Sequence, residues 1–201
     1  MNVKASVKYL SYDYKKTVRW YYISMVSVIL FLSFLSIIVK NSGGFTFGSM
    51  EFTTAVLAFI VGLYSFKESF FMMLQNGISR KTMFISRLIT IFVTCLTLAA
   101  IDRLILNAGA LLHKINDQLV IESLYDLMFE TRIAKLNIVL ANFEAIFVMM
   151  FIYMSVLLTG YFIAIAYYKM NKVLKIAVSI SVPAVLFVFL PIIDYMVFKG
   201  Q

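Results

Sequence analysis

Cysteine and histidine are almost absent from this sequence, which has one of each, Cys95 and His113. A single thiol cannot form an internal disulfide, and neither residue has a partner at metal-ligand spacing. His113 alone makes no catalytic triad with the scattered serines. We therefore expect no disulfide, no metal site and no catalytic residues of the triad type.

Catalytic and nucleotide-binding motifs are missing as well. The sequence contains no G-x-S-x-G, no H-E-x-x-H and no G-x-x-x-x-G-K-[ST], and each of these patterns is tied to a particular chemistry. The prediction is that the chain is not an enzyme and has no cofactor of its own. If it uses ATP, another chain binds the nucleotide and its magnesium.

Charged residues and prolines are scarce. Only 14% of the residues are charged, 62% are hydrophobic, and there are two prolines. Soluble domains carry about a quarter charged residues, so a soluble globular domain is excluded. The net charge of +8 does not indicate nucleic acid, because the cations lie between apolar runs, where they act as topology signals.

Long apolar runs occupy most of the chain instead. A helix that crosses a membrane needs about 20 mostly apolar residues, and a lone run of that length cannot be a barrel strand. The sequence therefore predicts an all-α membrane protein, with residues 20–201 forming one polytopic helical bundle of five spans. The spans are expected at about 20–39, 52–74, 88–106, 138–168 and 176–198.

The cations are distributed unevenly between alternate loops. With the N-terminus inside, eleven of the 18 Lys and Arg residues fall in inner segments, against a single acid. Cytoplasmic loops are enriched in Lys and Arg. The prediction is a multi-pass protein of the cell membrane with a cytoplasmic N-terminus. Lys15, Arg80 and Lys172 are expected inside, and Asn41 and Lys114 outside.

Residues 1–19 show an amphipathic pattern in which apolar side chains recur at spacings of three and four. This stripe consists of Val3, Val7, Leu10, Tyr14 and Val18, and the lysines lie off it. Such a basic helix lies in the membrane interface near anionic headgroups. We expect a separate cytoplasmic interface helix, which either only anchors the chain or also braces a cytoplasmic partner. The alternative, a secretory signal peptide, lacks a small-residue cleavage site.

Charges within the predicted spans are few. Lys67 and Glu68 lie in the second span, Arg103 follows Asp102 near the outer end of the third, and Glu144 lies in the fourth. A charge at such a depth is costly and faces a partner or water. These residues are either structural or part of a transport path. We expect Arg103 and Glu144, which have similar depths, to lie near each other.

The outer loop, residues 107–137, is too polar to span. Val120, Leu124, Leu127 and Met128 mark one face of a helical pattern. Glu122, Asp126 and Glu130 mark another. The pattern predicts a helix on the outer surface, with an acidic stripe that is either a solvated face or an attraction for cationic peptides or metal ions.

One short stretch is basic and flanked by apolar runs: LQNGISRKTMFISRLI, from Leu74 to Ile89. Its Asn-Gly dipeptide predicts a turn, and Ser79 is a plausible N-cap for a short helix after it. Arg80 and Lys81 at the start of that helix are unfavourable for its dipole. Cations there indicate either a loop that only holds the topology or a surface for headgroups or an acidic partner.

This stretch resembles the segment between the second and third spans of small type-2 ABC exporter permeases of Gram-positive bacteria, which carry an Asn-Gly-x-Ser-Arg-Lys-like turn there. The matching residues are Asn76, Gly77, Ser79, Arg80 and Lys81, followed by Phe84. In that family the segment is a short coupling helix that sits in a groove of the ATPase subunit. A second stretch, LLTGYFIAIAYYKMNKVLKIAVSISVP, with Gly160 and a basic turn, resembles the family's fourth span.

The resemblance implies a permease subunit of an ATP-driven ABC exporter that moves an amphipathic substrate, such as an antimicrobial peptide or a lipid-like molecule. Its partners would be ABC ATPase subunits, a second identical or similar permease, and membrane lipids. Met149, Met150 and Met154 are candidates for an adaptable path, although core packing is the simpler role. The family has six spans, so we expect either a five-span variant or a missing sixth span. The competing class is a stand-alone membrane immunity or sensor protein without an ATPase.

Overall fold

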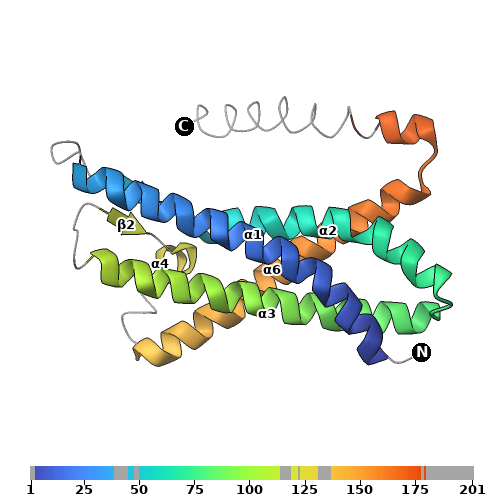
Figure 1. The fold of residues 1–201 in the computed structure, drawn as a ribbon, viewed down its shortest axis with the longest axis horizontal. Coiled ribbons are helices and arrows are strands. Elements are labelled where there is room, and N and C mark those ends of the chain that lie inside the picture. Colours follow the sequence, from blue (N-terminus) through green and yellow to red (C-terminus); the bar gives the residue numbers. More distant parts are fainter. Residues whose placement is uncertain are drawn as a thin grey trace, which may run out of the picture. The chain divides into compact units, whose positions relative to one another are not determined.

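The computed structural model describes residues 3–38, 45–47, 50–113, 119–121, 123–130, 137–177 and 179. Their elements follow one another along the chain as shown in Figure 1. They are α1 (Val3–Ile38), β1 (Phe45–Phe47), α2 (Met50–Gln75), α3 (Arg80–His113), β2 (Leu119–Ile121), α4 (Leu124–Met128) and α6 (Ile138–Lys169). The chain divides into two units, Met1–Phe162 and Ile163–Gln201.

Among the described residues, three helices are long and apolar enough to cross a membrane, over Val3–Leu35, Arg80–Ala110 and Ile138–Lys169. A shorter apolar helical segment, Met50–Phe66, forms the first part of α2. By length and composition this is a helical membrane protein, as predicted. The predicted fifth span, 176–198, lies almost entirely outside the described residues.

The helices α1 and α3 are longer than a membrane is thick. They have 36 and 34 residues, and at 1.5 Å per residue each is about 50 Å long, against about 40–45 Å for a bilayer with its headgroups. Neither glycine nor proline interrupts α1, and none occurs in α3 before Gly109. The ends of these two helices therefore extend beyond the hydrocarbon region.

The N-terminal segment differs from the prediction of a separate interface helix. Residues 3–38 form one continuous helix, because nothing in the sequence breaks it between the amphipathic segment and the first span. The predicted apolar stripe is real, since Leu10 and Tyr14 are buried and Lys8 is exposed. However, the stripe packs against protein, with Leu10 in one cluster with Met73.

The outer loop also differs from its prediction. Leu119–Ile121 is a strand, β2, that pairs in parallel with β1 and sets Thr46 opposite Val120. The helix that follows, α4, has only five residues. Val120 and Leu124 therefore do not share one helical face, and Glu122 of the predicted acidic stripe lies outside the described residues. Extended β-branched residues flanked by a polar cap outweighed the weak helical periodicity.

The core of the larger unit lies where α1, α2, α3 and α6 meet. The helices α2 and α6 approach closely at two glycines. A Cβ atom on Gly62 would lie 2.3 Å from the carbonyl oxygen of Leu157, and one on Gly160 would lie 2.5 Å from that of Phe59. Small residues of this kind let the backbones of membrane helices touch.

The second unit contains the predicted basic turn between Lys169 and Lys175. The helix α6 ends at Lys169, and residues 172–177 are helical again. The hydroxyl of Tyr167 donates to the carbonyl of Lys175 at 2.9 Å, and the amide of Lys175 donates to the carbonyl of Asn171 at 3.0 Å. These bonds close the turn.

Candidate functional site: an exposed basic turn on a buried base

The turn between α2 and α3 begins with a helix C-cap. Gly77 has a φ of 66°, in the left-handed region that favours glycine. The amide of Ile78 donates to the carbonyl of Met73 at 3.1 Å, which is the long-range bond of a Schellman motif. The apolar contact that accompanies this motif is present too, because Met73 and Ile78 lie in one buried cluster. The Asn-Gly pair therefore stops a helix here and does not form a hairpin.

The predicted N-cap at Ser79 is confirmed. The amide of Thr82 donates to the Ser79 side-chain oxygen at 3.2 Å, and Arg80 is the first residue of α3. The predicted short, separate helix is wrong, because Arg80 and Lys81 belong to a helix that continues without a break to His113. Two cations thus occupy the first turn of a long helix, where the macrodipole is unfavourable for them.

All the residues matched to the coupling segment are exposed: Asn76, Gly77, Ser79, Arg80, Lys81 and Phe84. Phe84 has 64% of its surface exposed. Between them, Ile78 and Met83 are buried. We call the six exposed residues the basic turn. Its buried neighbours fix its conformation, while its polar and aromatic side chains remain available for contact.

Helix α1 packs against the buried residues of this turn. Leu10 has 1% of its surface exposed and packs in one cluster with Met73, Ile78 and Met83. The first segment predicted to be cytoplasmic therefore lies against the second. The amphipathic stripe of α1 reads as the packing face of this contact, and its lysines remain on the outside.

Arg87, two helical turns after the start of α3, joins the four long helices. Its guanidinium donates to the hydroxyl of Tyr14 on α1 at 3.1 Å and to the carbonyl of Ser65 on α2 at 2.9 Å. It also lies 5.2 Å from the ring centre of Tyr161 on α6, within range for a cation–π contact. Only 4% of Arg87 is exposed. Arg87 therefore connects the helix that begins at the basic turn to the other three long helices.

Asp102, near the other end of α3, makes a second junction of the same kind. Its carboxylate accepts from the hydroxyls of Tyr22 on α1 at 2.7 Å, of Thr54 on α2 at 3.2 Å and of Tyr153 on α6 at 2.5 Å. Asp102 has 1% of its surface exposed. Three donors from three helices compensate for the cost of burying a carboxylate.

The ion-pair partner of Arg103 is an acid of the outer loop, and the nearness of Arg103 and Glu144, direct or through water, stays a prediction. Its guanidinium pairs with Asp126 of α4 at 3.1 Å and donates to the side-chain oxygen of Asn142 at 2.7 Å. Glu144 is two residues beyond Asn142 and so points about 200° around the axis of α6 from it. The ion pair with Arg103 thus uses an acid from the outer loop, which the estimate of depth along the spans could not consider.

Glu51 fixes the start of α4. Its carboxylate accepts from the Ser123 hydroxyl at 3.1 Å and from the backbone amides of Leu124 and Tyr125. Ser123 is also the N-cap of α4. A carboxylate at this end of a helix is stabilised by the orphan amides and the dipole. Glu51 and Asp126 hold α4 against α2 and α3.

The remaining candidates are placed as follows. Lys67 and Glu68 lie on α2, and their side chains are outside the described residues. Glu144 is half-buried on α6. Met149 and Met150 are buried in the core, and Met154 packs against it, which is the simpler of their two roles. Among the described residues, no group of three or more His, Cys, Asp or Glu side chains is placed to hold a metal ion.

Three important residues were not singled out from the sequence: Glu51, Arg87 as a junction, and Asp102. The signal for Asp102 was available, because an acid inside an apolar run is costly and points to partners. Its partners were not identifiable, since Tyr22, Thr54 and Tyr153 come from three other helices.

Comparison with known proteins gives no family. No family model matches the chain, no curated protein matches it, and no solved structure matches it.

Proposed function

We propose that this chain is the permease subunit of an ATP-driven ABC exporter, and that the basic turn is the surface on which the ATPase subunit docks. One observation carries the proposal: an exposed cationic surface at the start of α3 is connected to α1, α2 and α6 through Arg87. A topology signal requires only the charges. The caps, the buried base and the junction behind it are what a coupling element requires.

The charge pattern supports an acidic partner. Arg80 and Lys81 are exposed at a helix start, where an isolated helix gains more from acids. Opposite charges on a docking partner would remove this disadvantage and steer the encounter. Phe84, one turn further on, adds an apolar anchor of the type that carries binding energy at interfaces.

The geometry also supports transmission across the membrane. Arg87 and Asp102 each contact α1, α2 and α6 from α3. A push on the turn therefore moves linked helices as a group. An amphipathic substrate remains the proposed cargo, and pairing with a second permease remains the proposed assembly.

The experiment is purification of the tagged chain from its native membrane, followed by measurement of ATP hydrolysis in the eluate. The wild-type chain is expected to bring an ATPase with it. Arg80→Glu with Lys81→Glu is expected to insert normally and to lose that activity, because like charges would then meet at the interface. The matched control is Lys8→Glu with Lys16→Glu, which reverses two exposed cations of α1.

Two results would contradict the proposal. One is an eluate of the wild-type chain without ATP hydrolysis, which favours the stand-alone immunity or sensor protein. The other is equal ATP hydrolysis in the eluates of the Arg80→Glu, Lys81→Glu variant and of the control. That result would mean that the turn does not bind an ATPase.

A further inference from the structure

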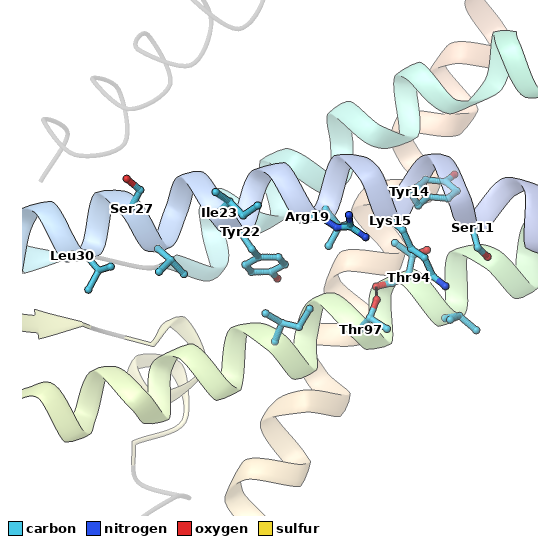
Figure 2. A pocket seen from close by; sticks show the side chains of 14 residues that line it. Ser11, Tyr14, Lys15, Arg19, Tyr22, Ile23, Ser27, Leu30, Thr94 and Thr97 are labelled. Atoms are coloured by element: carbon cyan, nitrogen blue, oxygen red, sulfur yellow. Dashed lines mark hydrogen bonds between the residues drawn. The ribbon is translucent and has the colours of Figure 1, made fainter.

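A groove of about 860 Å³ runs between α1 and α3. Figure 2 shows the 14 side chains that line it, all from these two helices. It lies apart from the exposed face of the basic turn. The helices touch at Tyr22 and Asp102, and the groove is open beside this contact.

The two ends of the groove differ in chemistry. Lys15 and Arg19 of α1 line one half, with Ser11 beyond them, and Val26 and Leu30 line the other half. Figure 2 shows the two cations well separated from Leu30 along α1. These α1 residues recur at spacings of four and seven, so they fall on one face of the helix. Thr97 of α3 lines the opposite wall. Of the 14 lining side chains two are basic and none is acidic.

The part of the groove between its cations and its apolar end matches one leaflet of a bilayer in length, and Ser11 lines the groove about one turn beyond Lys15. From Lys15 to Leu30 it follows about 22 Å of helix at 1.5 Å per residue. Half of a bilayer with its headgroups measures about 20–22 Å. When the two cations lie at headgroup depth, Leu30 therefore lies near the midplane.

We propose that this groove is a binding site for one anionic phospholipid of the leaflet on the N-terminal side. Lys15 and Arg19 bind the headgroup phosphate, and an acyl chain lies along Ile23, Val26 and Leu30. The site does not depend on a partnership with an ATPase, so it stands or falls separately from the proposed function.

Charge decides between this occupant and the others. A zwitterionic headgroup would bring an ammonium group to a pair of cations with no acid in the groove. A second copy docking across a two-fold axis would present the same patch. Its own Lys15 and Arg19 would then repel those of the first copy. A cationic peptide meets the same repulsion. An anionic amphiphile alone matches both ends.

The test is titration of the detergent-purified chain with phosphatidylglycerol or phosphatidylcholine, with bound lipid counted by native mass spectrometry. The wild-type chain is expected to retain one phosphatidylglycerol in preference to phosphatidylcholine. Lys15→Ser with Arg19→Ser should weaken that binding by about tenfold to thirtyfold, because each cation near an anionic headgroup contributes about 1 kcal/mol. The matched control is Lys8→Ser with Lys16→Ser, two exposed cations of α1 that do not line the groove.

A second pair of variants tests the acyl end without a change of charge. Val26→Trp fills the groove and should lower the retained lipid, whereas Val28→Trp, at an exposed position outside the lining, should not. A photoreactive residue at Thr97 should form adducts with lipid. Adducts with another copy or with another segment of this chain, or equal lipid retention in the Lys15/Arg19 variant and its control, would overturn the proposal.

Discussion

Arg87 and Asp102 lie on the same helix, about four turns apart, and each contacts α1, α2 and α6. Arg87 does so through Tyr14, Ser65 and Tyr161. Asp102 does so through Tyr22, Thr54 and Tyr153. The long helices are thus joined by polar contacts at two levels, with an apolar core between them.

The contribution of one buried hydrogen bond to stability can be measured at the Asp102 junction. Thr54→Val removes a donor to Asp102 and the partner of the Tyr21 hydroxyl. We expect a loss of about 0.5–2 kcal/mol of stability, seen as a lower midpoint of thermal unfolding in detergent. Thr53→Val, at the exposed neighbouring position, should change little. Equal effects of the two substitutions would argue against the junction.

The Arg87 junction depends on the shape of the guanidinium as well as its charge. Arg87→Lys keeps the charge that the topology uses, but an ammonium group cannot reproduce two directed bonds and a stacked ring. The expected loss is about 1–3 kcal/mol, measured by chemical unfolding in detergent. The matched control is Arg80→Lys, at an exposed site. A midpoint unchanged in both variants would show that Arg87 contributes only charge.

The crossing of α2 and α6 leaves no room for a side chain. Gly62→Ala and Gly160→Ala each place a methyl group against a backbone carbonyl of the other helix, so the helices must separate. We expect about 1–3 kcal/mol of destabilisation for each substitution.

Gly77 is the contrasting case, since it lies in open space with a positive φ. Gly77→Asn should be tolerated because asparagine accepts that conformation, and unfolding midpoints give the comparison.

The long helices and the N-cap of the basic turn could be predicted from the sequence. Apolar runs indicate the helices, the Asn-Gly dipeptide indicates a turn, and Ser79 indicates an N-cap. The turn is a helix C-cap and not the hairpin turn that this dipeptide favours. These signals are local, so they do not depend on which segments meet in space.

The contacts between helices could not be predicted in the same way. Arg103 pairs with Asp126, and a choice between several acids at a similar depth requires the rotation of each helix. The pairing of β1 with β2 joins two loops far apart in the sequence. The sequence predicts the apolar stripe of α1, but hydrophobicity alone does not distinguish a face that meets lipid from one that meets Met73 and Ile78.

The distribution of cations predicts which loops lie inside the cell and which lie outside. In a Cys95→Ala background, a cysteine at Lys15, Arg80 or Lys172 should react with a membrane-impermeant reagent only after the cells are opened. A cysteine at Asn41 or Lys114 should react in intact cells. The reason is the excess of cations in the inner segments. If a cysteine at Arg80 were labelled from outside intact cells, the predicted orientation would be wrong.

The most direct test of the central claim is cross-linking at Phe84 in living cells. Phe84 lies beside Arg80 and Lys81 on the basic turn, and its ring is exposed. A photoreactive residue at this position should form an adduct with an ATP-binding subunit, and the adduct should disappear when Arg80→Glu and Lys81→Glu are added. The same probe at Phe143, an exposed position on α6, should give no such adduct. Only lipid adducts at Phe84, or an ATPase adduct that survives the charge reversal, would contradict a docking role for the turn.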